Sequence, residues 1–265
     1  MALPEPVMAR GLPVPAQAGA AAVPPPERPV FVSDLHLSLA MPRTLLGFRS
    51  FLRREALGYR ELFILGDLFA YWVGDDFRWL AGPVTGWLTR YAATGRKLYI
   101  MQGNRDVMLG RAYAERCGAT LLASQVAIEA PAGRILLAHG DEWCTLDRDY
   151  QDFRAMLRDP AWQARMLSIT VRERIAWARS ARAKSVAGKK AKSAALMDVV
   201  PGAIARDAAK FGARLVIHGH THKPAAHTDE AVPRWVIPDW DLDRAPRRSG
   251  WVELGAGGEP RLVIR

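Results

Sequence analysis

Cysteine is scarce in this 265-residue chain, which has two, Cys117 and Cys144. Two cysteines provide no disulfide framework, so small secreted disulfide-bonded scaffolds are excluded and a reducing compartment, the cytosol, is expected. Long apolar runs are also lacking, because Asp67 interrupts the richest apolar region, residues 62–73. A helical membrane span needs roughly 20 apolar residues. The sequence therefore predicts a protein that does not span a bilayer.

Acidic residues are in deficit as well: 27 Asp and Glu stand against 37 Lys and Arg, a net charge of +10 at pH 7. Such an excess indicates a polyanionic partner, which could be nucleic acid, a phosphorylated metabolite or an anionic membrane surface. With 49% hydrophobic and 24% charged residues, the composition argues against wholesale disorder. We expect a globular protein, and the charge alone does not choose its partner.

The chain alternates between short apolar runs and helix-like segments after an Ala- and Pro-rich start. Residues 1–27 predict a flexible tail, because their prolines prevent helix continuation and little apolar surface is available. From residue 28 on, each apolar run ends abruptly in polar residues, which predicts an α/β fold with buried strands. The predicted strands are 30–32, 62–65, 98–101, 135–138 and 215–217, and helices are predicted over 42–57 and 84–94.

Residues 146–200 differ and predict a helical insertion between two parts of a core, 28–145 and 201–265. Helix starts are indicated by Asp159-Pro160 and by Thr170 with Glu173, a capping box. Residues 165–192 carry nine Lys and Arg against the single acid Glu173. We interpret this stretch as an amphipathic basic helix, although a merely solvated charged face is the alternative. Its apolar positions are Leu167, Val171, Ile175 and Ala178.

Polar residues that bind divalent metals follow each predicted strand. In α/β sheets the ligands bind beyond the carboxyl ends of the strands, so these residues are expected to converge. Imidazole, carboxylate and amide donors suit two divalent ions that share one carboxylate. Singly, a Gly-Asp dipeptide is usually a turn and Asp34 could be a helix N-cap, but five clusters together favour metal binding. The seven candidates are Asp34, His36, Asp67, Asn104, His139, His220 and His222.

Two of these clusters pair residues that are two positions apart. On an extended segment such residues point the same way, so Asp34 with His36, and His220 with His222, are each expected to clasp one ion. Glycine at position 219 would let the backbone approach the site closely. Asp106 and Asp141 are expected to orient neighbouring loops rather than bind metal.

The motif order Asp-x-His, Gly-Asp, Gly-Asn-Arg-Asp, His-Gly-Asp and Gly-His-Thr-His resembles that of the calcineurin-like metallophosphoesterases. This resemblance implies a four-layered αββα sandwich with two divalent metal ions, for which it favours Mn²⁺. Asp67 would bridge the two metals. The resemblance implies Asp34, His36, Asp67 and His222 as ligands of one metal, and Asp67, Asn104, His139 and His220 as ligands of the other.

Arg105 stands where most relatives have a histidine. With this arginine and with residues 150–154 and 192–199, the sequence resembles the UDP-2,3-diacylglucosamine pyrophosphohydrolase family of lipid A biosynthesis. The resemblance implies hydrolysis of UDP-2,3-diacylglucosamine to UMP and 2,3-diacylglucosamine 1-phosphate, by metal-activated water attack on the α-phosphorus. The insertion would be a lid over the acyl chains, and Arg105 a catalytic residue. The implied substrate contacts are Asn104, Arg105, Asp147, Tyr150, Ser185, Lys192 and His220, with Lys189 at a position that is usually uncharged.

The basic, amphipathic segment between His139 and His220 also predicts peripheral contact with the cytoplasmic face of the inner membrane. The alternative is another calcineurin-like phosphodiesterase or a nuclease, for which the basic charge would be a phosphate-backbone footprint. The charge is instead concentrated in a segment with an apolar face, and no interleaved aromatic stacking platform is evident, so no nucleic-acid partner is expected. A non-catalytic protein that kept the fold ranks lower, because every ligand position is filled.

Overall fold

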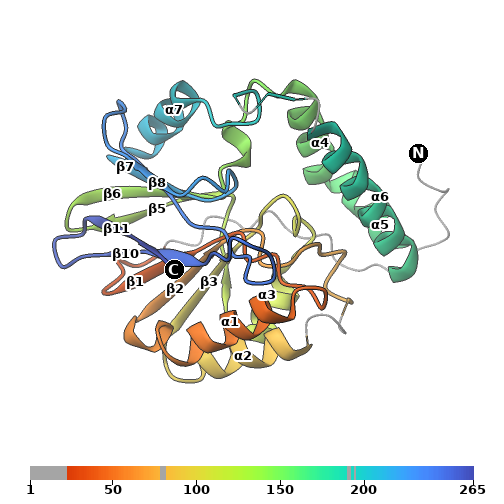
Figure 1. The fold of residues 1–265 in the computed structure, drawn as a ribbon, viewed down its shortest axis with the longest axis horizontal. Helices are drawn as coiled ribbons and strands as arrows, with labels where there is room; N and C mark the ends of the chain where they lie inside the picture. The colour runs from red at the N-terminus through yellow and green to blue at the C-terminus, as the bar shows by residue number, and fades with distance from the viewer. Residues whose placement is uncertain (1–22, 78–81, 190–191, 194) are drawn as a thin grey trace.

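The structure is a computed structural model that describes residues 23–77, 82–189, 192–193 and 195–265 (Figure 1). Most of the predicted tail, residues 1–22, lies outside the described residues, and residues 23–27 contain no helix or strand. Two β-sheets lie face to face, with helices on their outer sides (Figure 1). The fold is the predicted αββα sandwich.

The first sheet has six strands and the second has five. The six-stranded sheet has the order β11-β10-β1-β2-β3-β4, and the five-stranded sheet has the order β5-β6-β7-β9-β8. The strands are β1 (Pro29–Val32), β2 (Glu61–Leu65), β3 (Lys97–Met101), β4 (Thr120–Leu121), β5 (Gln125–Ala130), β6 (Gly133–Ala138), β7 (Leu215–His218), β8 (Ala225–His227), β9 (Arg234–Val236), β10 (Gly250–Leu254) and β11 (Pro260–Ile264).

Helices cover the outer face of each sheet, and three further helices stand to one side (Figure 1). The six-stranded sheet carries α1 (Pro42–Arg53), α2 (Gly82–Ala92) and α3 (Arg111–Cys117), whereas the other sheet carries α7 (Pro201–Phe211). The side group is α4 (Arg148–Arg158), α5 (Pro160–Ser168) and α6 (Val171–Lys189), with short 3-10 turns at η1 (Ala56–Gly58) and η2 (Asp141–Trp143).

The central strands are mostly apolar because both of their faces are buried. In β1, Val30 and Val32 pack against the helices, whereas Phe31 packs between the sheets. In β6, Ile135 likewise faces the other sheet and Leu136 faces α7. Successive side chains of a strand point to opposite faces, so a strand covered on both sides reads as a continuous apolar run. This explains why the sequence predicted these strands.

Parallel pairing brings the carboxyl ends of the central strands together. Strands β1, β2 and β3 pair in parallel in one sheet, and β6, β7 and β9 do so in the other. The loops that follow these strands therefore share one edge of the sandwich, next to α4 and α6 (Figure 1).

Helices form where the sequence placed the insertion, with one correction. The side chain of Asp159 accepts a hydrogen bond from the Trp162 amide at the start of α5, and Thr170 and Glu173 form the capping box of α6. Because that capping box starts a new helix, Leu167 belongs to α5, and the single basic helix predicted over 165–192 is wrong. The alternative, in which the Arg and Lys side chains form one solvated face, fails at Arg174, which is 2% exposed and pairs with Asp76.

Candidate metal centre and adjoining cavity

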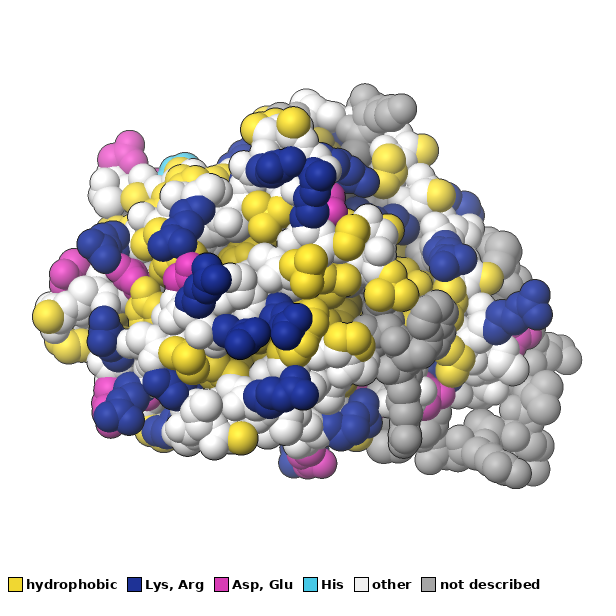
Figure 2. Space-filling model, turned by 60° about the horizontal axis from the view of Figure 1, so that its bottom comes forward, with side chains coloured by type: hydrophobic (Ala, Val, Ile, Leu, Met, Phe, Trp, Pro, Cys, Tyr) yellow, Lys and Arg dark blue, Asp and Glu magenta, His cyan; other side chains and the backbone are white. Residues whose placement is uncertain are grey.

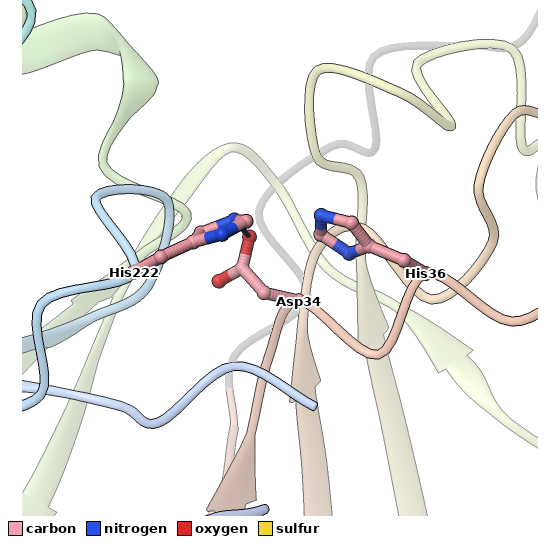
Figure 3. Close-up of side chains that lie close together, drawn as sticks. All are labelled: Asp34, His36 and His222. Atoms are coloured by element: carbon pink, nitrogen blue, oxygen red, sulfur yellow. Dashed lines mark hydrogen bonds and ion pairs between the residues drawn. The ribbon is translucent and has the colours of Figure 1, made fainter. Parts of the chain in front are cut away.

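The structure brings all seven predicted metal ligands to one place. The ligand atoms of Asp34, His36 and His222 lie within 4.8 Å of one another (Figure 3), as do those of Asp34, Asp67 and His139. The last two predicted ligands adjoin them, because Oδ1 of Asn104 lies 3.1 Å from a ring nitrogen of His139 and 3.1 Å from one of His220. The ligands follow β1, β2 and β3 of one sheet and β6 and β7 of the other.

The backbone of these loops is left-handed, which corrects the expectation of extended segments. Among the described residues, the non-glycine residues with positive φ are all predicted metal ligands. Backbone strain of this kind costs about 1–3 kcal/mol per residue and is typical of functional sites. The residues with φ between 50° and 69° are Asp34, His36, Asp67, His220 and His222.

The left-handed turns also separate two residues that were expected to clasp one ion. His220 faces Asn104, and its ring centroid lies 5.2 Å from that of His139. In contrast, Nε2 of His222 lies 3.2 Å from Oδ1 of Asp34. The expectation that His220 and His222 point the same way is therefore wrong. Their separation instead matches the ligand division that the family resemblance implies.

The polar atoms of this cluster fit a cation. Both ring nitrogens of His36 are buried and, within the described part of the chain, have no hydrogen-bond partner. The Nδ1 atom of His139 contacts the Leu65 carbonyl at 2.9 Å, so the neutral ring carries its proton there and has a lone pair on Nε2. That lone pair faces the Oδ1 acceptor of Asn104 at 3.1 Å. A divalent ion would satisfy these facing acceptors.

Burial keeps two of the predicted histidine ligands neutral. It lowers the pKa of His220 to about 3, with help from His139, and holds the pKa of His36 well below its usual range. Both imidazoles are therefore neutral at pH 7, as a metal requires. Burial raises the pKa of Asp67, although His139 and Arg105 oppose this. Nearby positive charge thus favours the ionised form of this carboxylate, which burial disfavours.

Asp106 and Asp141 hold loops in place, as predicted. Asp106 accepts hydrogen bonds from the backbone amides of Gly103, Asp67 and Phe69 at 2.7–3.3 Å, and so joins the loops after β2 and β3. Asp141 accepts from the Tyr150 hydroxyl at 3.0 Å and pairs with Arg154 and Arg158, and so joins the loop after β6 to α4.

Glycine 219 is required by the close packing of two ligand loops. A Cβ atom at Gly219 would lie 2.3 Å from Oδ2 of Asp34 and 2.1 Å from Oγ of Ser33. The same Asp34 oxygen accepts a hydrogen bond from the His220 amide at 2.8 Å. The close backbone approach expected at this glycine is confirmed.

A cavity of about 1060 Å³ adjoins the metal ligands and extends along α4, α5 and α6. Near the ligands, Lys192 pairs with Asp147, and the ring of Tyr150 stacks on His220 with 5.8 Å between centroids. Lys189 ends α6, and its side chain lies outside the described residues. The predicted substrate contacts that line the cavity are Asn104, Arg105, Asp147, Tyr150, Ser185, Lys192 and His220.

One wall of the cavity, the aromatic wall, is formed by Phe153, Trp162 and Trp177. The sequence analysis did not identify these residues, or Arg182, as part of a binding site. Trp162 and Trp177 lie 5.0 Å apart by ring centroid, and Phe153 stacks on Trp177 at 6.4 Å. Arg182 lines the cavity from α6, and Asp67 acts on it electrostatically. The helical spacing of Trp177 and Arg182 could not distinguish a cavity wall from an ordinary core-facing or solvated position.

Arg105 connects the cavity to the central carboxylate. Its backbone amide donates to Oδ1 of Asp67 at 2.8 Å, and its Nε atom lies 3.1 Å from Oδ2 of Asp67. Burial lowers the pKa of Arg105 to about 10, with a contribution from Arg182, so the side chain remains charged at pH 7. The cavity beside the metal ligands is therefore lined by two arginines, Arg105 and Arg182.

These features define a class of protein. The profile of the calcineurin-like phosphoesterase family matches residues 28–224, so the chain belongs to that family and is a hydrolase. The family implies divalent metal ions, for which the clustered ligands provide candidate positions.

The chain is also similar to curated proteins named UDP-2,3-diacylglucosamine hydrolase. It is 42% identical to that of Bordetella parapertussis over 85% of this chain and 91% of the relative. The protein of Chromobacterium violaceum is 44% identical over 88% of this chain and 98% of its own length. That of Chromohalobacter salexigens is 38% identical over 88% and 95%, respectively.

The surface of the described residues is rich in basic side chains. Lys and Arg spread over the face that α1 and α2 form in Figure 2, in addition to the insertion, so the positive charge is less concentrated than the sequence suggested. Among the described helices, none combines the length and the apolar character needed to cross a membrane.

Proposed function

We propose that this chain hydrolyses the diphosphate of UDP-2,3-diacylglucosamine and releases UMP and 2,3-diacylglucosamine 1-phosphate, a step of lipid A biosynthesis. The observation that carries the proposal is the cavity beside the metal ligands, because four of the predicted ligands, cationic side chains and a group of aromatic rings all line it. An acylated sugar nucleotide has the matching parts: a diphosphate, polar rings and apolar chains. The names of the relatives support the same substrate.

The proposal assigns the seven ligands to two Mn²⁺ ions, with Asp67 between them. When bound, such ions would act as Lewis acids on phosphoryl oxygens and water. The resemblance assigns Asp34, His36 and His222 with Asp67 to one ion, and Asn104, His139 and His220 with Asp67 to the other.

Arg105 is proposed to bind the phosphate oxygens of the scissile diphosphate. Its guanidinium is a planar, permanently charged donor that can contact two oxygens at once. A phosphate leaving group needs little protonation, so a charged arginine can replace the histidine of other relatives.

Residues of the insertion are proposed to bind the rest of the substrate and to exclude water. Asp147, Tyr150, Ser185, Lys189 and Lys192 would contact the polar part. The aromatic wall would contact the acyl chains, and the basic outer face of α6 would lie peripherally on the cytoplasmic face of the inner membrane. In this proposal, residues 146–200 are a lid over the core formed by 28–145 and 201–265.

The test is to incubate the purified protein with UDP-2,3-diacylglucosamine and Mn²⁺ and to measure UMP. We expect UMP with this substrate and much less from UDP-N-acetylglucosamine, which keeps the diphosphate but lacks the acyl chains. Release of UMP from both at equal rates would contradict the role of the aromatic wall. Preferential cleavage of DNA or of a simple phosphodiester would favour the nuclease or phosphodiesterase alternative.

A further inference from the structure

The segment after β9 closes one side of the metal centre, although no metal-binding motif lies in it. The amide of Ile237 donates to the His218 carbonyl at 2.7 Å, and the amide of Trp240 donates to the carbonyl of Asp34 at 3.1 Å. These two bonds fix Asp239 between them. The side chain of Asp239 is 3% exposed.

Asp239 contacts the ring nitrogen of His222 that faces away from Asp34. Its Oδ2 atom lies 3.3 Å from Nδ1 of His222, whereas Nε2 of the same ring lies 3.2 Å from Oδ1 of Asp34. Arg248 holds Asp239 from the other side, with Nε at 2.8 and 2.9 Å from its two oxygens and Nη2 at 2.7 Å. The carboxylate therefore has a fixed orientation toward the imidazole.

His139 is arranged in the same way by a different acceptor. Its Nδ1 atom contacts the Leu65 carbonyl at 2.9 Å, and its Nε2 atom faces Asn104 and Asp67. In metal sites, an oxygen acceptor on the second ring nitrogen sets the tautomer and the ring orientation of a ligating histidine. In both His222 and His139, Nδ1 thus contacts an oxygen atom outside the ligand cluster, and Nε2 faces the cluster.

We propose that Asp239, held by Arg248, is a positioning residue that directs Nε2 of His222 toward a metal ion. The inference rests on the proposed metal-binding role of His222 and extends the site to a segment outside the family motifs. Asp239 would keep the proton of the neutral ring on Nδ1 and raise the basicity of Nε2.

Calorimetric titration of the metal-free protein with Mn²⁺ alone tests this inference. We expect Asp239→Asn to weaken one of two binding steps by about 10- to 100-fold, the range for outer partners of metal ligands, and to leave the other step unchanged. Arg248→Gln should weaken the same step to a smaller extent, because the Asp239 carboxylate is still present but is no longer held by Arg248. The matched control is Asp241→Asn, a buried residue of the same segment whose side chain accepts from the amides of residues 243 and 244.

A double-mutant cycle separates positioning from a general structural effect. In a His222→Ala background, Asp239→Asn should cause no further loss of Mn²⁺ affinity, because its effect passes through the missing ring. Unchanged Mn²⁺ affinity in both Asp239→Asn and Arg248→Gln, or a full additional loss in the His222→Ala background, would overturn the inference and leave the proposed function standing. Absence of Mn²⁺ binding by the unsubstituted protein would overturn both.

Discussion

Asp67 is the residue on which both proposed metal positions depend. Its Oδ2 atom lies 3.8 Å from Nε2 of His36, and its Oδ1 atom lies 3.7 Å from Nε2 of His139. We expect Asp67→Ala to reduce kcat/KM by more than about 100-fold, since even outer partners of metal ligands cost about 10- to 100-fold. Hydrolysis kinetics and metal content check this. Near-normal turnover with two bound ions would show that Asp67 is not the bridge.

Arg105 should affect the reaction without affecting metal binding. Its backbone amide, which survives substitution, donates to Asp67, so Arg105→Ala should keep both ions. We expect kcat/KM to fall about 10²-fold, as for the loss of one charge-assisted contact in the transition state. Arg105→Lys should recover part of the loss, because a point charge lacks the planar fork. Loss of metal from Arg105→Ala would mean that its main role is to hold Asp67.

Metal affinity should rise with pH through the titration of His222. Burial lowers the pKa of this residue, but Asp34 and Asp239 outweigh burial and raise it to about 9 in the metal-free protein. Below that pH a metal ion must displace the proton, so affinity should increase by up to about one log unit per pH unit. Mn²⁺ titrations between about pH 6.5 and 8.5 measure this slope. A flat profile would contradict a ligating role for His222.

At the scale of elements, the sequence predicted what depends on local pattern. The strands before Asp34, Asp67 and His139 are apolar on both faces, and the polar residue that ends each run is visible without a structure. The left-handed turns were not predicted, because Asp and His carry no local signal for positive φ comparable to that of glycine. Asp239 was missed, although it follows a parallel strand as the predicted ligands do.

Helix α6 shows a second limit of sequence reasoning. Its charge suggested a uniform basic face, yet Arg174 points inward, donating to the carbonyl of Val73 and pairing with Asp76. Those partners lie about 100 positions earlier in the chain. A long-range ion pair of this kind cannot be read from helical spacing, which distinguishes faces but not their partners.

The exposed basic residues of α6 are expected to bind anionic membranes. Replacing Arg172 and Arg179 with Glu reverses two charges and should lower binding to phosphatidylglycerol vesicles, because each basic residue near such a surface contributes about 1 kcal/mol. Arg174 is left in place because it is buried. The control is Arg206→Glu with Arg214→Glu, which makes the same change in net charge near α7. Equal binding by both variants in vesicle sedimentation would favour the solvated-face interpretation.

At the scale of the whole molecule, the candidate metal centre lies where the two sheets meet. Asp34, His36, Asp67 and Asn104 follow strands of the six-stranded sheet, whereas the other three predicted ligands follow strands of the five-stranded sheet. The sequence could not assign strands to sheets, because pairing between distant segments is not encoded in any local pattern. Ions at this position would join the two halves of the sandwich.

Metal removal should therefore lower the stability of the entire fold. A ligand that binds only the folded state stabilises it by about 2.7 kcal/mol at 100 times its Kd. For a chain of this size, each kcal/mol corresponds to about 2–4 °C in Tm, so one such site is worth roughly 5–10 °C. We expect chelation to lower Tm by at least that amount, with recovery on adding Mn²⁺. The Asp67→Ala variant should show little recovery, because it lacks the carboxylate proposed to hold both ions. If neither chelator nor Mn²⁺ changed the Tm of the unsubstituted protein, the two sheets would be held together by their apolar interface alone.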